Sequence, residues 1–349
     1  MNAYAIIMAG GNGERLWPLS TPERPKQFVS LFGDKPLIRH AADRLKGVFT
    51  PDKIFVITAK RLVAMTRKAL PHIPKENIIG EPCRRDTAAA VAVACGLVKK
   101  HGGAKAIGCI LTADHLMSPE AEFRRALKDA IKVASKNSAI VTMGVHPDYP
   151  ATRFGYIECG DNLVTKTKTQ FRYVKRFVEK PNETVARKFL CEGGYCWNLG
   201  MFIWRADVLT NAFLKVAPDI GTIIDKVSVA GNISAILKRE YVNLRAISFD
   251  YAVMEKINDI IVAEGTFLWD DVGSWVSTAK YFSKDNANNV CIGETMLHDV
   301  SNSIVVGNDG NVVALVGVDN LVVVRTKGAT LVCAKDRVED IKKLFIPKS

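Results

Sequence analysis

The hydrophobic pattern of residues 4–111 alternates short, continuously apolar runs with longer stretches of helical periodicity. A continuous apolar run predicts a strand that is buried on both faces of a parallel sheet. Apolar residues repeating every three or four positions predict helices that cover such a sheet. The predicted strands are 4–8, 53–58 and 106–111, and the predicted helices are 36–48, 62–70 and 86–100. This order predicts an α/β fold with a Rossmann-like, mainly parallel sheet and flanking helices.

Beyond Val145 the pattern is less regular and predicts a mixed continuation of the sheet. We expect strands at 155–158, 171–179 and 200–204, and helices at 206–216 and 250–256. After about residue 285, short Val-rich runs are divided by Gly, Asn and Asp. These predict strands at 303–306, 312–316, 321–324 and 330–333, with a final helix at 337–345. The chain should therefore contain a large domain over 1–284 and a small β-rich domain over 285–349.

Composition narrows the class of protein. The 349 residues are 48% hydrophobic and 24% charged, as in a globular protein with a sizeable core. No apolar run approaches the roughly 20 residues that cross a membrane, and no signal peptide is visible, so we expect a cytoplasmic protein without a membrane partner. The eight cysteines form neither a CxxC pair nor a His/Cys cluster of zinc spacing, and most should be small core residues.

The net charge of +12 raises the question of an anionic partner. It is compatible with nucleic acid, with an anionic surface or with nothing more than a basic proteome. The basic stretch 166–188 is interleaved with acids and lacks the aromatic spacing of an RNA-binding sheet. We therefore expect no nucleic-acid partner, and a small, phosphate-rich substrate would use the charge equally well.

The segment behind the first strand carries the strongest chemical signal. Gly10, Gly11 and Gly13 lack a Cβ atom, so backbone N–H groups can approach an anion closely. Arg15 and Lys26 add fixed positive charge to what we expect to be an exposed phosphate-binding loop. The sequence fits neither the dinucleotide fingerprint GxGxxG, because Leu16 stands where glycine is required, nor the P-loop pattern.

Three aspartates are candidate metal ligands. Asp114 follows a predicted strand, and Asp270 and Asp271 lie far along the chain in WDDVGSW. Two carboxylates from distant segments suit Mg²⁺, which binds few protein oxygens and keeps positions for water and phosphate. Asp114 could equally be a helix cap or a turn residue, and Asp270 could be structural.

Taken as a whole, GGNGERLWPLS followed by PKQF resembles the signature of the sugar-nucleotidyltransferases. With Trp17 and PKQF it is most similar to the mannose-1-phosphate guanylyltransferases. Further similar motifs lie between Ala5 and Trp275, namely EPCRRDTAAA, FGYI, FVEKP, WNLGMF and SFDYAVMEK. Thr112, Leu199 and Asp86 depart from the family pattern.

The resemblance implies transfer of GMP from GTP to α-D-mannose 1-phosphate, giving GDP-mannose and pyrophosphate with Mg²⁺ as cofactor. It also implies a β-helix-like C-terminal domain and leaves room for a homodimer. The implied catalytic residues are Arg15 and Lys26, and the implied Mg²⁺ ligands are Asp114 and Asp271. The implied nucleotide-binding residues are Gly10, Gly11, Gly13, Glu81, Asp86 and Thr87. The implied sugar-phosphate residues are Gly155, Glu179, Lys180 and Asn198.

Several alternatives remain open at this point. Glu81 could accept hydrogen bonds from the guanine base, whereas Asp86 and Thr87 could merely cap the long helix. Glu179 and Lys180 could be a solvated surface pair, and Asn198 a turn residue. The protein could use another base or another hexose 1-phosphate, or it could be a non-catalytic subunit that binds sugar nucleotides. The metal carboxylates argue against the last alternative, because binding alone does not require them.

Overall fold

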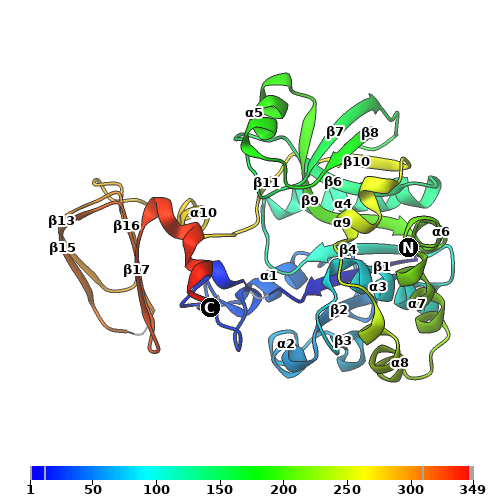
Figure 1. Ribbon diagram of the computed structural model, residues 1–349, viewed down its shortest axis with the longest axis horizontal. Coiled ribbons are helices and arrows are strands. Elements are labelled where there is room, and N and C mark those ends of the chain that lie inside the picture. The colour runs from blue at the N-terminus through cyan, green and yellow to red at the C-terminus, as the bar shows by residue number, and fades with distance from the viewer. Residues whose placement is uncertain (1, 12, 309, 346–349) are drawn as a thin grey trace. The chain divides into compact units, whose positions relative to one another are not determined.

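The computed structural model describes residues 2–11, 13–308 and 310–345, which fall into two compact units (Figure 1). The larger unit contains Met1–Gly10, Ala41–Ala113 and Met117–Trp269, and the smaller unit contains Gly11–His40, Asp114–Leu116 and Asp270–Ser349. Helix α1 (Leu37–Asp43) and strands β5 (Leu116–Ser118) and β11 (Leu268–Asp270) lie where the chain passes between them. The units interleave along the chain, and the domain boundary after residue 284 stays a prediction.

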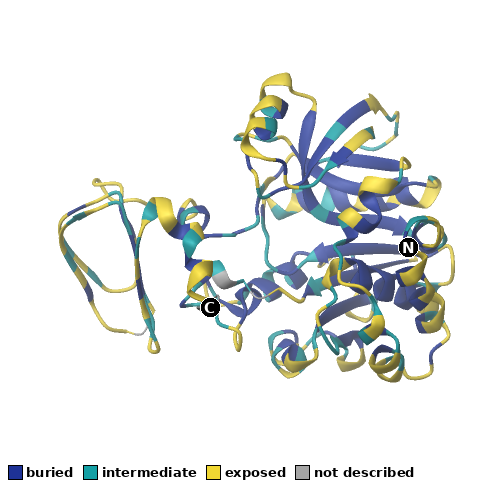
Figure 2. Ribbon diagram, in the orientation of Figure 1, coloured by how far each residue is buried: buried dark blue, intermediate teal, exposed yellow. Residues whose placement is uncertain are grey.

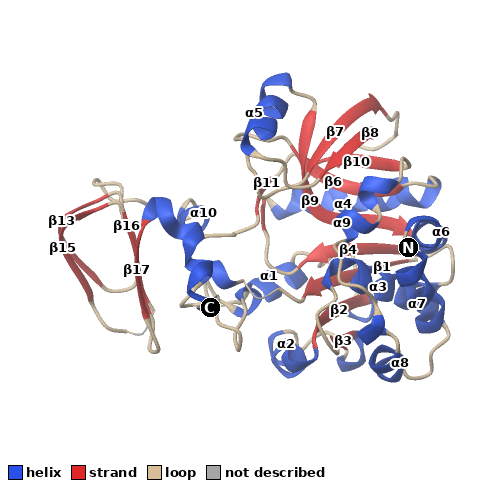
Figure 3. Cartoon of the chain, viewed as in Figure 1, coloured by secondary structure: helices blue, strands red, loops and turns tan. Residues whose placement is uncertain are grey.

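Within the described residues of the larger unit, nine strands form one mixed sheet in the order β3-β2-β1-β4-β9-β6-β10-β8-β7 (Figure 3). β1 is parallel to β2 and β4, and β6 is parallel to β10, whereas β9 and β8 run antiparallel to their neighbours. The predicted mixed, mainly parallel α/β sheet is thereby confirmed. The strand bounds are β1 Ala3–Ala9, β2 Ile54–Ala59, β3 Ile78–Glu81, β4 Ile107–Thr112, β6 Ile140–Val145, β7 Tyr156–Asn162, β8 Gln170–Val178, β9 Tyr195–Arg205 and β10 Ile260–Glu264.

Helices cover this sheet. The apolar helix α3 is buried along its middle, from Ala88 to Val98, and packs against β1, β4 and the helices α6, α7 and α9 (Figure 2). The amphipathic helix α4 packs against β4, β6, β9 and β10. None of the described helices is both long and apolar enough to cross a membrane. The helix bounds are α2 Val63–Ala69, α3 Asp86–Gly102, α4 Glu120–Lys136, α5 Glu183–Glu192, α6 Ala206–Val216, α7 Pro218–Ser228, α8 Ile233–Arg239 and α9 Phe249–Ala252.

Two predicted helices differ from the structure in their bounds. The predicted helix 36–48 is shorter, because α1 ends at Asp43, and the predicted helix 250–256 is broken at Val253 into α9 and the 3-10 turn η7 (Met254–Lys256). The helices α4, α5, α7, α8 and α10 and the strands β3, β5, β6, β10, β11, β12 and β13 were not predicted. The side chain of Ser248, two residues before Asp250, caps α9 by accepting from the Tyr251 N–H at 3.3 Å.

The smaller unit contains a β-helix-like stack. The strands β12 (Val290–Ile292), β14 (Ile304–Gly307), β16 (Leu321–Arg325) and β17 (Thr330–Ala334) form one sheet, and β13 (Thr295–Ser301) pairs with β15 (Val313–Asp319). Ile304 pairs with Val322 and Thr295 with Val313, so each of these steps between stacked strands spans 18 residues. The predicted Val-rich strands are confirmed, and the predicted final helix is a 3-10 helix, η8 (Lys335–Phe345).

Alternation along β14 and β16 divides their side chains between two cores. Ile304, Val306, Val322 and Val324 pack in one cluster with Trp275 of the short helix α10 (Trp275–Ala279). The intervening residues Val305 and Val323 pack with Val313 in a second cluster. Because successive side chains of a strand point to opposite faces, both faces of these strands are buried. This explains why they read as nearly continuous valine runs.

Asparagines form a ladder at one turn of this stack. Asn288, Asn302 and Asn320 have φ values of 65°, 47° and 54°, a backbone region that asparagine tolerates better than most residues. Asn288 Nδ2 donates to Asn302 Oδ1 at 2.9 Å, and Asn302 Nδ2 donates to Asn320 Oδ1 at 3.1 Å. The Lys335 ammonium donates to Asn302 Oδ1 at 2.7 Å. The polar residues between the valine runs therefore join successive coils.

We expect Gly108→Ala to destabilise the larger unit by about 1–3 kcal/mol, the usual cost of overpacking a core. A Cβ atom on Gly108 would lie 2.2 Å from the ring of the fully buried Trp204 on the paired strand β9. Gly231→Ala is the control, because its Cβ would meet nothing within 4 Å. Urea unfolding measures both, and equal midpoints for the two variants would contradict the prediction.

Candidate active site

The backbone at Gly13 passes directly over Lys26, within the smaller unit. Gly13 has a φ of 63°, and a Cβ atom there would lie 2.1 Å from Lys26 Cβ. The Gly13 carbonyl accepts from Ser20 Oγ at 2.5 Å. Only glycine satisfies both the left-handed backbone and this close approach. The Gly13 backbone therefore lies against the lysine for which the family resemblance implies a catalytic role.

Lys26, in the 3-10 turn η2 (Lys26–Phe28), makes two contacts from its ammonium group. Nζ donates to Asp114 Oδ2 at 2.9 Å and to the backbone carbonyl of Asp271. The Lys26 side chain is only 8% exposed, so the expectation of an exposed lysine is wrong. The ion pair and the hydrogen bond to the carbonyl offset the free-energy cost of burying the charged ammonium group.

Asp114 is held in its ionised form. Burial by itself would raise the pKa of this carboxyl, but the charge of Lys26, the neighbouring His115 and hydrogen bonds from Lys26 and the backbone outweigh it and lower the pKa below the ordinary value. The Asp114 side chain is 33% exposed to solvent. An anionic and accessible carboxylate is what binding of a hard cation requires.

The two aspartates in the turn at 270–273 differ in burial. Asp270 is buried, and its Oδ1 accepts from the Val272 N–H at 2.6 Å, which holds the turn. Asp271 is half-buried, and its Oδ1 accepts from the Gly273 N–H at 3.2 Å. Val272 between them has a φ of 47°, an unusual value for a β-branched residue that costs of order 1–3 kcal/mol. Asp270 is thus engaged in structure, and Asp271 is the better candidate ligand.

Arg15 lies in the 3-10 turn η1 (Glu14–Leu16) and pairs with Glu339 of η8, with 3.5 Å between Nε and Oε2. The Arg15 side chain is 38% exposed, so this is a surface ion pair of small energy. Such a pair can be exchanged for a phosphate at little cost. The catalytic role of Arg15 stays a prediction.

Glu81, at the end of β3 in the larger unit, accepts a hydrogen bond from the hydroxyl of Tyr241. A Cβ atom on Gly10 would lie 3.2 Å from the other carboxylate oxygen, Oε2. Burial raises the pKa of Glu81, and the Tyr241 hydrogen bond opposes that shift in part. The fully buried Tyr241, in the turn η6 (Tyr241–Asn243), carried no signal in the sequence.

The start of α3 is tied to the start of α9 by a hydrogen bond. Asp86 has a φ of 59°, and its Oδ1 accepts from the Thr87 N–H at 2.8 Å. Thr87 Oγ1 accepts from the Phe249 N–H at 2.8 Å. The N-cap residue of α3 is Arg85, whose side chain makes no capping bond, so neither Asp86 nor Thr87 is the cap. Their nucleotide-binding role stays a prediction.

Gly155, Glu179 and Asn198 converge in the larger unit. A Cβ atom on Gly155 would lie 2.6 Å from Glu179 Oε2, and the Gly155 carbonyl accepts from the Asn198 N–H at 2.8 Å. Lys180 Nζ lies 2.5 Å from Glu179 Oε1. The Glu179 side chain is 7% exposed and that of Lys180 is 56% exposed. The glutamate is therefore buried rather than part of a solvated surface pair.

Hydrogen bonds fix the Asn198 amide. Its Oδ1 accepts from Thr142 Oγ1 at 2.9 Å and from the Gly200 N–H at 3.3 Å, and its Nδ2 donates to Asp250 Oδ1 at 3.2 Å. Burial first, and then the charge of Glu179, raise the pKa of Asp250 to about 7. Asn198 is thus a member of a buried polar network rather than a plain turn residue.

The Glu255 carboxylate and the Lys180 ammonium also interact with Glu179. Glu255 Oε1 accepts from the Glu179 N–H at 3.1 Å. Burial would lower the pKa of Lys180, but its hydrogen bond to Glu179 and the charges of Glu179 and Asp250 raise it above the ordinary value. Lys180 therefore remains a cation at neutral pH. Within the SFDYAVMEK motif, Asp250 is a plausible helix cap on sequence grounds and Glu255 has no assigned role. The cap prediction is wrong, because Ser248 caps α9. The sequence gave no signal for Thr142.

Comparison with known proteins identifies the family. The nucleotidyl transferase family model matches residues 4–309, and the MannoseP isomerase/GMP-like beta-helix domain matches residues 293–345. Mannose-1-phosphate guanylyltransferase 2 of Escherichia coli O157:H7 is 36% identical over 350 residues, which cover 97% of this chain and 72% of the relative. A mannose-1-phosphate guanylyltransferase of Salmonella montevideo is 38% identical over 353 residues, with the same coverage. The chain belongs to the mannose-1-phosphate guanylyltransferase family.

A solved structure extends this similarity to the whole fold. The crystal structure described as mannose-1-phosphate geranyltransferase from Thermus thermophilus matches with a TM-score of 0.89 and 32% identity, covering 99% of this chain and 98% of that chain. The resemblance read from GGNGERLWPLS and PKQF is confirmed, as are the nucleotidyltransferase fold and the β-helix-like C-terminal domain of the mannose-1-phosphate guanylyltransferase family.

We expect Asp250→Asn to gain stability relative to the unmodified protein as pH rises from about 4 to about 7. The pKa of the folded-state carboxyl is raised from 3.8 to about 7, so in this window the folded state keeps a proton that the unfolded chain releases. Stability of the unmodified protein therefore falls with rising pH, and the asparagine removes that loss. The difference between the two proteins should grow by about 1–4 kcal/mol.

Urea unfolding at pH 4.5, 6 and 8 measures this difference. Asp161→Asn is the control, because Asp161 is exposed on β7. A difference that stays constant over the three pH values for Asp250→Asn would show that its carboxyl is ionised throughout.

Proposed function

We propose that this chain catalyses the reaction for which its family is named, the transfer of GMP from GTP to α-D-mannose 1-phosphate, which yields GDP-mannose and pyrophosphate. The observation that carries the proposal is the buried Lys26 ammonium, held against the Asp114 carboxylate and the Asp271 carbonyl beneath the Gly13 turn. Beside a glycine-rich turn, the cation can bind a phosphoryl group, and the two carboxylates can bind a divalent ion. Kinship with the guanylyltransferases supports the choice of substrates.

The reaction requires no covalent nucleophile. A phosphate monoester has a second pKa of about 6, so at neutral pH the sugar phosphate is already anionic and can attack the α-phosphorus of GTP in line. The task of the protein is to hold two mutually repelling anions and to stabilise the charge that develops between them. Lys26 and Arg15 supply fixed cations for this purpose.

The residues present fit a divalent cation. Asp114 and Asp271 provide carboxylate oxygens, which Mg²⁺ prefers over nitrogen or sulfur, and the lowered pKa of Asp114 keeps its charge available. These two side chains would hold the ion, which would supply neutralisation of phosphate charge. Lys26 keeps the two ligands oriented through its contacts with both residues.

The residues of the larger unit are assigned to recognition. Glu179 would accept hydrogen bonds from sugar hydroxyls, the oriented Asn198 amide would contact the ring, and the half-exposed Lys180 would meet the sugar phosphate. Gly155 leaves the space that Glu179 occupies. Glu81 has one oxygen bound to Tyr241 and the other beside Gly10, and we assign it to the guanine base together with the Gly10–Gly13 segment, Asp86 and Thr87.

The test of the proposal is a pyrophosphate-release assay that crosses four nucleoside triphosphates with mannose, glucose, fucose and N-acetylglucosamine 1-phosphates. We expect the highest kcat/KM for GTP with mannose 1-phosphate. A clear preference for another base or another hexose would favour the alternative reaction on the same fold. A cytoplasmic location and a homodimer remain predictions from the sequence.

We expect Asp114→Asn and Asp271→Asn each to lower Mg²⁺-dependent turnover by roughly a hundredfold or more, because an amide keeps the shape of the ligand but removes its charge. Asp270→Asn is the matched control, since its Oδ1 can still accept from the Val272 N–H and the turn is kept. Pyrophosphate release is measured against Mg²⁺ concentration, with circular dichroism to verify folding. Loss of activity in Asp270→Asn with normal turnover in Asp271→Asn would reverse the assignment.

We expect Glu179→Gln to raise KM for mannose 1-phosphate roughly tenfold and to narrow the preference over glucose 1-phosphate. A buried group that loses its hydrogen-bonding match costs about 1–3 kcal/mol, which is a factor of that order. Glu183→Gln is the control, because Glu183 makes an exposed ion pair with Arg187 at 2.6 Å. GTP affinity by calorimetry should stay unchanged, and a loss of GTP affinity with intact sugar preference would contradict the assignment.

A further inference from the structure

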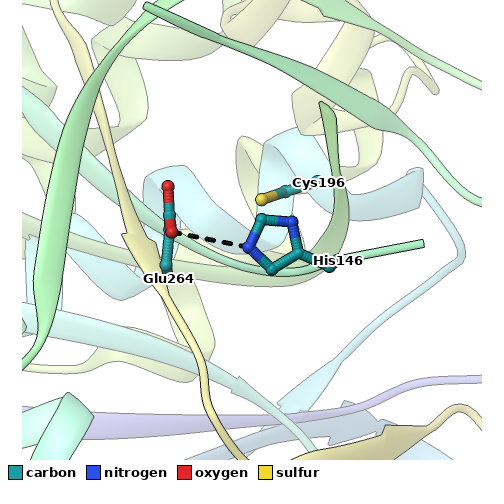
Figure 4. Close-up of side chains that lie close together, drawn as sticks. All are labelled: His146, Cys196 and Glu264. Atoms are coloured by element: carbon teal, nitrogen blue, oxygen red, sulfur yellow. Dashed lines mark ion pairs between the residues drawn. The ribbon is translucent and has the colours of Figure 1, made fainter. Parts of the chain in front are cut away.

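A second group of metal-ligating side chains lies in the larger unit, apart from the residues assigned above. His146 follows the end of β6, Cys196 lies in β9 and Glu264 ends β10. One ligand atom from each of these three residues lies within 4.8 Å of the other two. Figure 4 shows the His146 ring, the Cys196 sulfur and the Glu264 carboxylate turned toward one another. Sequence spacing gave no sign of this group, because the strands that carry it are distant in the chain.

A second cysteine lies beside these three donors, although its sulfur is not among the atoms that all lie within 4.8 Å of one another. Cys159 of β7 lies beside Cys196, with 3.6 Å between the two sulfur atoms. His146 Nε2 lies 3.5 Å from Glu264 Oε2. With zinc–sulfur bonds of about 2.3 Å and zinc–nitrogen or zinc–oxygen bonds of about 2.1 Å, a tetrahedral site has ligand separations of about 3.7 Å and 3.4 Å for these two pairs. Both observed distances are close to these values before any ion is bound.

Three residues of this group are buried, and the histidine is exposed to solvent. Cys196 is fully buried, Cys159 is 6% exposed and the Glu264 side chain is 10% exposed. Glu264 Oε1 is buried and accepts no hydrogen bond within the described residues. The His146 side chain is 66% exposed, so the group meets solvent on the histidine side. A buried polar atom without a hydrogen bond is costly unless a ligand satisfies it.

The charges around the group balance with a divalent ion. Two thiolates and one carboxylate carry three negative charges, and the imidazole is neutral when it binds metal. Arg172 Nη1 lies 3.7 Å from Glu264 Oε1 and adds one positive charge. A divalent cation therefore brings the whole group to neutrality, which a buried site requires.

We propose that Cys196, His146 and Glu264 bind one Zn²⁺ or a similar thiophilic divalent ion, with the neighbouring Cys159 as the fourth ligand once its sulfur moves toward the ion. Sulfur and imidazole donors select such ions, whereas the all-oxygen pair Asp114 and Asp271 selects Mg²⁺. The two sites thus differ in ligand chemistry. The proposal does not depend on the transferase reaction.

Cobalt titration of the reduced, chelator-treated full-length protein tests this proposal. Co²⁺ should bind at one equivalent and give the charge-transfer absorption of cobalt–thiolate bonds, and one equivalent of Zn²⁺ should abolish that absorption. A large excess of Mg²⁺ should leave it unchanged. Absence of the thiolate band, or its loss in Mg²⁺, would overturn the proposal.

Variants locate the ion. Cys196→Ala and His146→Ala should each weaken Co²⁺ binding by more than about a hundredfold, because even residues that only orient metal ligands cost 10–100-fold. His146→Ala changes an exposed side chain and leaves the core intact. It therefore tests the site even if Cys196→Ala does not fold. The controls are Cys191→Ala, at an exposed cysteine, and His298→Ala, at an exposed histidine 3.4 Å from the Asp299 carboxylate. An unchanged band in His146→Ala, or a lost band in either control, would overturn the assignment.

Discussion

The smaller unit depends on one buried cation. The Lys26 ammonium binds the Asp114 carboxylate and the Asp271 carbonyl, which lie far away in the sequence. The Gly13 backbone passes close to the Cβ atom of the same lysine. Removing one partner of such a buried pair typically costs roughly 3–5 kcal/mol, since the other charge is left unpaired. The same contact keeps Asp114 ionised. Structure and proposed chemistry therefore rest on the same lysine.

Unusual backbone conformations lie at several residues that the motifs single out. Gly13, Asp86, Lys180 and Val272 have φ values of 63°, 59°, 44° and 47°. Glycine takes up this conformation at no cost, but for the other three it costs of order 1–3 kcal/mol each. Such strain is maintained when the surroundings fix it, as the hydrogen bond from the Val272 N–H to Asp270 does here.

Two aspartates show how neighbours decide the charge of a carboxyl. Asp114 and Asp250 are both influenced by burial, but Asp114 faces a lysine ammonium, whereas Asp250 faces the Glu179 carboxylate. The pKa of the first is lowered and that of the second is raised to about 7. Asp114 is therefore suited to hold a cation, and Asp250 to stay protonated within a hydrogen-bonded network at pH values below 7.

Local patterns in the chain were enough to predict the class of fold, the β-rich C-terminal region and the family, because hydrophobic periodicity and motif strings are properties of neighbouring residues. They did not reveal that Lys26 is buried, that Tyr241 binds Glu81, or that Cys196 lies together with His146 and Glu264 and beside Cys159. These facts arise when segments far apart in the chain become neighbours in the fold. The exposed fraction of a side chain, its ion pairs and the metal ligands beside it all depend on the residues that surround it. Those residues are set by the folded structure and not by any single stretch of sequence.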